Sequence, residues 1–168
     1  MTDDILTPQG RFKAGAGAAR WRPRLAATLE IIAAEATRLT DEWWIIGSAA
    51  AALSGAEIAD VRDVDLLLGE GDARALLERW ASVRNVPTDP DQKFRSAIFA
   101  RFEHGPLPIE AFGGFEMKIR SRWRNVTPLT RVRRGAVFTP SVAEQIAILE
   151  AMDRDKDRLR AAALRAQL

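Results

Sequence analysis

An apolar stretch that carries two acidic residues, at residues 63–68, most constrains the fold of this 168-residue chain. It begins Asp63-Val64-Asp65-Leu66 and continues with two further leucines, a composition that predicts a β-strand. Because side chains alternate along a strand, Asp63 and Asp65 project from the same face. Two carboxylates so close repel each other, and an exposed strand end bridged by a divalent cation tolerates them best. The pair therefore predicts a sheet with a metal-binding edge.

Short strands and helices alternate along the rest of the chain. Apolar periodicity and turn residues predict helices at residues 23–39, 49–53 and 72–84, and strands at residues 43–46, 63–68, 96–102, 107–112 and 136–138. A turn-rich loop is predicted at residues 87–91, and the basic segment 118–134 fits no single type. We expect an α/β (α+β) fold with a mixed sheet flanked by helices.

A final helix is predicted to begin after Pro140. Ser141 and Glu144 have the spacing of a capping box. The apolar positions of this one C-terminal helix are expected to be Val142, Ile146, Leu149 and Leu159. Residues 1–20 are interpreted as a polar N-terminal arm, and residues 21–168 as one domain of ordinary size.

Composition excludes several classes of protein. The formal charge of +2 does not by itself predict strong attraction to nucleic acid or membrane. There is no cysteine, which rules out disulfides, a thiolate nucleophile and a cysteine-ligated zinc site. The acidic start lacks a secretory h-region, and no apolar run approaches the ~20 residues that span a bilayer. We expect a cytoplasmic protein without a membrane partner.

Two further features fit the acidic pair. Gly47 and Ser48 follow a predicted strand and precede a helix, where backbone amides and a hydroxyl can bind phosphate. Glu110 interrupts a short apolar strand, where a carboxylate must be paired, exposed at an edge or bound to a metal.

Together these residues resemble the nucleotidyltransferase superfamily, which includes DNA polymerase β and antibiotic nucleotidyltransferases. The matching elements are a strand ending in Gly47-Ser48, the apolar strand with Asp63 and Asp65, and a separate strand with Glu110. The stretch 154–157, Arg-Asp-Lys-Asp, further resembles small bacterial members, including the AbiEii-like toxin group. The resemblance implies a minimal nucleotidyltransferase fold.

It also implies roles for individual residues. Asp63 and Asp65, with Glu110, would bind Mg²⁺, two ions being expected, and Glu110 would help to activate an acceptor hydroxyl. Gly47 and Ser48 would bind the phosphates of an NTP, with ATP favoured, and Lys156 and Asp157 would be accessory residues. Such an enzyme moves a nucleoside monophosphate from NTP to a hydroxyl of a small molecule, a protein or an RNA.

Other interpretations stay open for the same residues. Ser48 can be a helix N-cap, Glu110 a solvated edge residue, and Lys156 with Asp157 part of a charged helix face. Arg62 before the first acid and the long spacing from Ser48 support a catalytically weak or inert binding module, or a toxin–antitoxin component with a partner protein. The basic segment 118–134, which includes Trp123, can bind a triphosphate, an acidic partner or RNA, or lie solvated.

Overall fold

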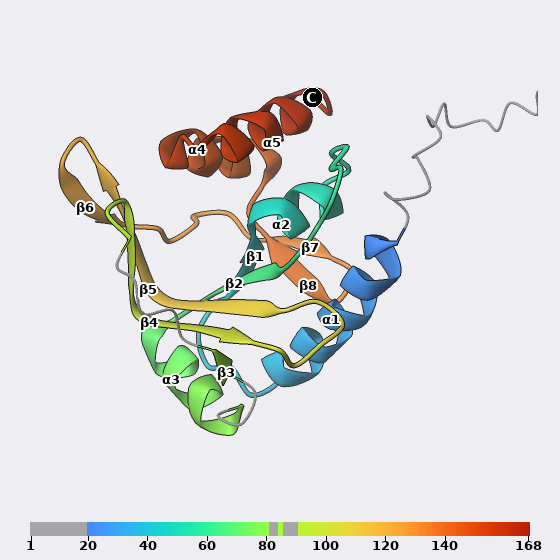
Figure 1. Ribbon diagram of the computed structural model, residues 1–168, viewed down its shortest axis with the longest axis vertical. Coiled ribbons are helices and arrows are strands. Elements are labelled where there is room, and N and C mark those ends of the chain that lie inside the picture. The colour runs from blue at the N-terminus through green and yellow to red at the C-terminus, as the bar shows by residue number, and fades with distance from the viewer. Residues whose placement is uncertain (1–19, 81–83, 86–90) are drawn as a thin grey trace, which may run out of the picture.

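A mixed six-stranded sheet organises the chain in the computed structural model, which describes residues 20–80, 84–85 and 91–168 (Figure 1). Most of the predicted N-terminal arm and of the predicted loop 87–91 lies outside the described residues. The helices are α1 (Trp21–Ala36), α2 (Gly47–Leu53), α3 (Glu70–Arg79), α4 (Val142–Met152) and α5 (Asp155–Arg165). The strands are β1 (Trp44–Ile46), β2 (Val64–Leu68), β3 (Arg84–Asn85), β4 (Phe94–Phe102), β5 (Ile109–Ile119), β6 (Arg122–Asn125), β7 (Val132–Arg134) and β8 (Val137–Thr139).

The strands follow the order β1-β2-β5-β4-β3, and β6 pairs with β5. β2 and β5 run parallel, whereas the other pairs in the sheet are antiparallel. β7 and β8 form a separate two-stranded sheet beside α1 and β1. The expected α/β architecture with a mixed sheet is therefore confirmed.

Each face of the sheet has its own apolar cluster. Alternation along β2 directs Val64, Leu66 and Leu68 into the main core, which also contains side chains of α1 and α3. On the opposite face, Leu67 belongs to a smaller cluster with Met152 at the end of α4. Asp65 shares the face of Leu67, so α4 and α5 lie on the side of the sheet that carries the acidic pair (Figure 1).

The predicted C-terminal helix is two helices, and the single-helix prediction was wrong. Asp153 ends α4 in the left-handed conformation, with φ 54°, and Arg154 then begins α5. A capping box between Arg154 and Asp157 stabilises the new helix start. Leu159, predicted to be an apolar contact, is 73% exposed, because α5 leaves the direction that α4 would have continued.

The predicted start of α4 is correct, but the capping box there is half formed. The Ser141 hydroxyl accepts a hydrogen bond from the backbone N–H of Glu144 at 3.3 Å. The Glu144 carboxylate instead accepts from the backbone N–H groups of Leu129 and Thr130, at 2.6 and 2.8 Å. Glu144 therefore anchors the loop before β7.

Segment 118–134, which the sequence left unclassified, contains the end of β5, β6 and β7. β5 and β6 form a hairpin that projects from the sheet, with Arg120 and Ser121 at its turn in positive φ (Figure 1). No helix within the described residues combines the length and apolar character required to cross a membrane.

Candidate active site

Parallel pairing of β2 with β5 brings the three predicted acids together. The Cα partner of Asp65 on β5 is Glu110, and Asp63 immediately precedes β2 on the same face. All three residues line one cavity, together with Gly47. The structure therefore places these four predicted residues at one site.

The turn from β1 into α2 fits closely against Asp65. Gly47 has φ 69°, and a Cβ at this position would lie 2.3 Å from Asp65 Oδ2. Glycine is thus required both by the backbone conformation and by the neighbouring carboxylate. Ser48 is buried in the first turn of α2, beside the cavity lining, and the N-cap of this helix is Ile46. The interpretation of Ser48 as the N-cap was wrong.

Arg101 on β4 occupies the space between two of the acids. Its Nη1 donates a hydrogen bond to Glu110 Oε1 at 2.8 Å and lies 3.7 Å from Asp63 Oδ2. The register explains this contact, because Arg101 is the β4 partner of Glu110. Within the described part of the chain, no three acids or histidines are close enough to enclose one ion. The carboxylates therefore surround an open site and form no preassembled cage.

Asp65 has a pKa that is strongly shifted by its surroundings. Burial, followed by the charges of Asp63 and Glu110, raises the pKa of Asp65 to about 8. Lys156 and Arg160 act in the opposite direction but do not compensate. Without a bound cation, Asp65 thus holds a proton near neutral pH, whereas a divalent cation would favour its ionised form.

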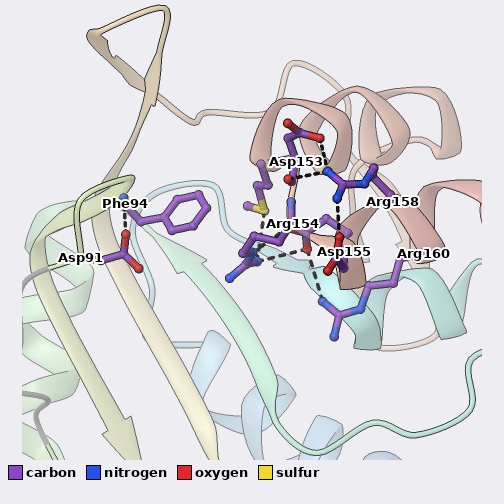
Figure 2. Close-up of polar contacts among 9 residues, drawn as sticks. Asp91, Phe94, Asp153, Arg154, Asp155, Arg158 and Arg160 are labelled. Atoms are coloured by element: carbon purple, nitrogen blue, oxygen red, sulfur yellow. Dashed lines mark hydrogen bonds and ion pairs between the residues drawn. The ribbon is translucent and has the colours of Figure 1, made fainter.

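Arg154, Lys156 and Arg160, at the start of α5, line the same cavity as the acids and are here called the basic wall; Figure 2 shows Arg154 and Arg160. Asp157 is fully buried, and its carboxylate accepts from Arg154 Nε at 2.6 Å and Nη2 at 3.1 Å. Arg160 Nη1 lies 3.6 Å from the same carboxylate. Asp157 therefore holds two guanidinium groups in place, while exposed Lys156 also lines the cavity.

The part of the cavity that lies farther along β4 and β5 from the acids is aromatic. The cavity has a volume of about 470 Å³, and β4 and β5 contribute four phenylalanines to its lining: Phe94, Phe99, Phe112 and Phe115. The guanidinium of Arg154 lies over the ring of Phe94, 4.8 Å from its centroid, and so joins the two ends (Figure 2). One cavity combines carboxylates, cations and an apolar surface.

Sequence reasoning missed Arg101, Arg160 and the aromatic end. Alternation within residues 96–102 places Phe99 and Arg101 on one face, which was the available signal. The face toward Glu110 depends on strand register, which the sequence does not supply. The break between α4 and α5 similarly determines where Arg160 lies.

The arrangement of side chains can bind a polyanion next to a hydroxyl group. Carboxylates bind hard cations such as Mg²⁺, which also coordinate phosphate oxygens. Lys156 and Arg160 offer positive charge to phosphate oxygens that the acids would repel. Such a site can hold a triphosphate tail close to a carboxylate that accepts a proton.

Comparison with known proteins yields structural likeness only. No family model matches the sequence, and no curated protein matches it. The structure resembles a candidate nucleotidyltransferase from Thermotoga maritima, with a TM-score of 0.66 and 19% identity over 87% of this chain and 93% of that one.

Two antibiotic-resistance proteins are also similar in structure. The lincosamide antibiotic adenylyltransferase LnuA, solved with lincomycin bound, gives a TM-score of 0.55 and 11% identity over 84% of this chain and 94% of that one. The antibiotic-resistance factor ANT(2'')-Ia gives 0.53 and 14% over 87% of this chain and 84% of that one. At these identities the likeness shows a shared fold.

Proposed function

We propose that this chain, whose fold is that of the nucleotidyltransferases, is a Mg²⁺-dependent enzyme that transfers a nucleoside monophosphate from NTP to a hydroxyl acceptor. The observation that carries the proposal is the convergence of Asp63, Asp65 and Glu110 on one cavity, opposite the basic wall of α5. ATP is the favoured donor. The fold shared with LnuA, named as an adenylyltransferase, supports this choice.

The donor set of the site fits Mg²⁺. This ion prefers oxygen ligands, keeps several of its waters, and is usually bound by one or two carboxylates together with substrate phosphates. Asp63 and Asp65 are the residues that would hold it, and Glu110 lies beside them in the same cavity. When bound, such ions would stabilise the negative charge on both the attacking and the leaving oxygen of an in-line displacement.

The protein groups have separate tasks in this reaction. The acceptor oxygen forms a bond to the α-phosphorus, the bond from that phosphorus to the oxygen bridging the α- and β-phosphorus atoms breaks, and pyrophosphate leaves. Glu110 accepts the acceptor's proton, and Arg101 holds the Glu110 carboxylate in position through its 2.8 Å hydrogen bond. Lys156 and Arg160 bind the phosphates from the α5 side, and the Gly47 turn lets the triphosphate approach the backbone.

Isothermal titration of ATP, CTP, GTP and UTP into the protein, with and without Mg²⁺, tests the proposal. We expect ATP to bind in the presence of Mg²⁺ and to lose most of its affinity in EDTA. The Asp63→Asn/Asp65→Asn variant should show the same loss in the presence of Mg²⁺. Asp60→Asn is a matched control, because Asp60 pairs with Arg62 at the surface and does not line the cavity.

A second candidate function is a catalytically inactive binding module or a toxin–antitoxin component with a partner protein. The ion pairs of Arg101 with Glu110 and Asp63 favour it, because an internal cation partly replaces a metal. This candidate predicts no Mg²⁺ requirement and no effect of the Asn substitutions. Absence of binding by any nucleotide would decide for it.

A further inference from the structure

A break in strand alternation gathers the aromatic end of the cavity. Phe112 and Phe115 are three residues apart on β5, so regular alternation would direct them to opposite faces. Their ring centroids are nevertheless 5.1 Å apart. Gly114, with φ 63°, lies between them, and a Cβ there would be 3.2 Å from Ala97 Cβ on β4. The left-handed glycine resets the alternation and keeps both rings in the cavity.

The four rings form one continuous surface, here called the phenylalanine shelf: Phe94, Phe99, Phe112 and Phe115. Phe99 and Phe112 are cross-strand partners with centroids 4.8 Å apart, and Phe94 stacks on Phe115 at 5.9 Å. Phe99 and Phe112 line the cavity and are only partly buried. Apolar rings left open to a cavity favour binding of another apolar surface.

Charges near the shelf already have partners. Asp91 accepts hydrogen bonds from the backbone N–H groups of Lys93 and Phe94, at 2.7 and 3.1 Å (Figure 2). Arg95 pairs with Glu116, and Arg154 pairs with Asp157. The shelf therefore offers a ligand apolar contact, while the carboxylates without a hydrogen-bonded cation lie at the other end.

The position of the shelf identifies which substrate it faces. Phe112 is two residues from Glu110 on β5, and Phe99 is two residues from Arg101 on β4, on the same faces. The shelf thus continues from the carboxylate assigned to the acceptor hydroxyl. The groups assigned to phosphate, Gly47 and the side chains of α5, lie on other elements.

We propose that the phenylalanine shelf binds the apolar, ring-bearing part of a small acceptor whose hydroxyl is presented to Glu110. The proposal rests on the proposed function for the identity of the reaction, and it names the substrate class. It selects flat apolar alcohols and disfavours polyols.

The probe for this test is 2-naphthalenemethanol, a primary alcohol on a flat apolar ring system, with myo-inositol as the polar counterpart. Binding is measured by titration calorimetry and saturation-transfer NMR, without nucleotide and then with ATP and Mg²⁺. We expect the aromatic alcohol to bind and inositol not to bind. Phe99→Ala should raise the dissociation constant of the alcohol at least tenfold, and the milder Phe99→Leu about threefold.

Phe138→Leu is the matched control, because Phe138 on β8 is also partly buried but packs against Trp43 and does not line the cavity. It should leave alcohol binding unchanged. Alcohol binding that is absent, or indifferent to Phe99, would overturn the proposal. Competition between the alcohol and ATP, with loss of ATP affinity in Phe99→Ala, would also overturn it, since the shelf would then hold the nucleobase.

The two proposals fail in different ways. Asp63→Asn/Asp65→Asn should abolish Mg²⁺-dependent ATP binding and leave binding of the alcohol unchanged. If ATP never binds but the alcohol binds through Phe99, the proposed transfer fails and the acceptor assignment falls with it, while the shelf remains a binding site for apolar rings.

Discussion

Asp65 and Asp157 line the same cavity from opposite walls, yet they have opposite surroundings. The Asp157 carboxylate is fully buried and accepts charge-assisted hydrogen bonds from Arg154, with Arg160 nearby. Asp65 lies beside two further acids, and none of the ion pairs in the described part of the chain includes it. Removing a buried charge that has partners destabilises a fold, whereas a carboxylate among like charges is available for a ligand.

The largest expected effect is on folding, from Asp157→Asn. Arg154 and Arg160 would lose a buried anion, and the free energy of unfolding should fall by about 3 kcal/mol, since Arg154 is only partly solvated. Urea denaturation in EDTA measures this. Asp155→Asn, two residues away at a 95% exposed side chain, should change stability by less than about 0.5 kcal/mol. If both variants lower the free energy of unfolding by the same amount, Asp157 has no special structural role and the contrast with Asp65 fails.

Asp65→Asn should act on ligand binding and leave the protein folded. We expect Mg²⁺-dependent ATP affinity to fall on the order of a hundredfold, because the substitution removes the proposed metal ligand and its charge. Calorimetric titration at fixed Mg²⁺ gives the value. An unchanged affinity would show that Asp65 does not contribute to the nucleotide site.

Gly47→Ala tests the close fit that confines Asp65. The substituent meets Asp65 Oδ2 and requires a left-handed backbone, so a loss of about 2 kcal/mol is expected. In an Asp65→Ala background the same change should cost only about 1 kcal/mol, because the steric contact is gone. Gly71→Ala in α3, where a Cβ meets nothing within 4 Å, is the control and should not destabilise. Additive costs in the thermal-melting cycle would contradict this account.

The pH dependence of stability in EDTA tests the like-charge surroundings of Asp65. The pKa of Asp65 is raised from 3.8 to about 8 in the folded protein. Between these values the folded state holds a proton that the unfolded state releases, so the contribution of Asp65 to stability falls as pH rises. Relative to the wild type, Asp65→Asn should therefore be stabilising at pH 8 and not at pH 4. If the denaturation midpoints of the wild type and of Asp65→Asn differ by the same amount at pH 4 and at pH 8, the prediction is refuted.

Local patterns made much of the fold predictable. Residues 63–68 and Ser141 were assigned correctly because alternation and capping depend on near neighbours. The parallel pairing of β2 with β5, which unites Asp65 with Glu110, could be reached only through the family resemblance. It joins segments separated by more than 40 residues, and nothing local encodes its register.

The remainder of the site depends on local exceptions. Asp153 adopts a left-handed conformation, which aspartate tolerates but which its presence in a sequence does not predict. The break before α5 was therefore missed. Gly114 likewise resets β5, and the prediction ended that strand at residue 112. Both exceptions place side chains in the cavity, which explains why the acids were predicted and the shelf was not.

The division of the cavity between β2–β5 and α5 has a consequence for protein synthesis. The acids and the shelf are translated before Arg154, Lys156 and Arg160, which complete the basic wall. A nascent chain released up to β8 would present the acidic sheet edge without its cationic counterpart. The basic wall is therefore complete only after α5 has emerged from the ribosome and docked, so the proposed nucleotide site would form after the sheet.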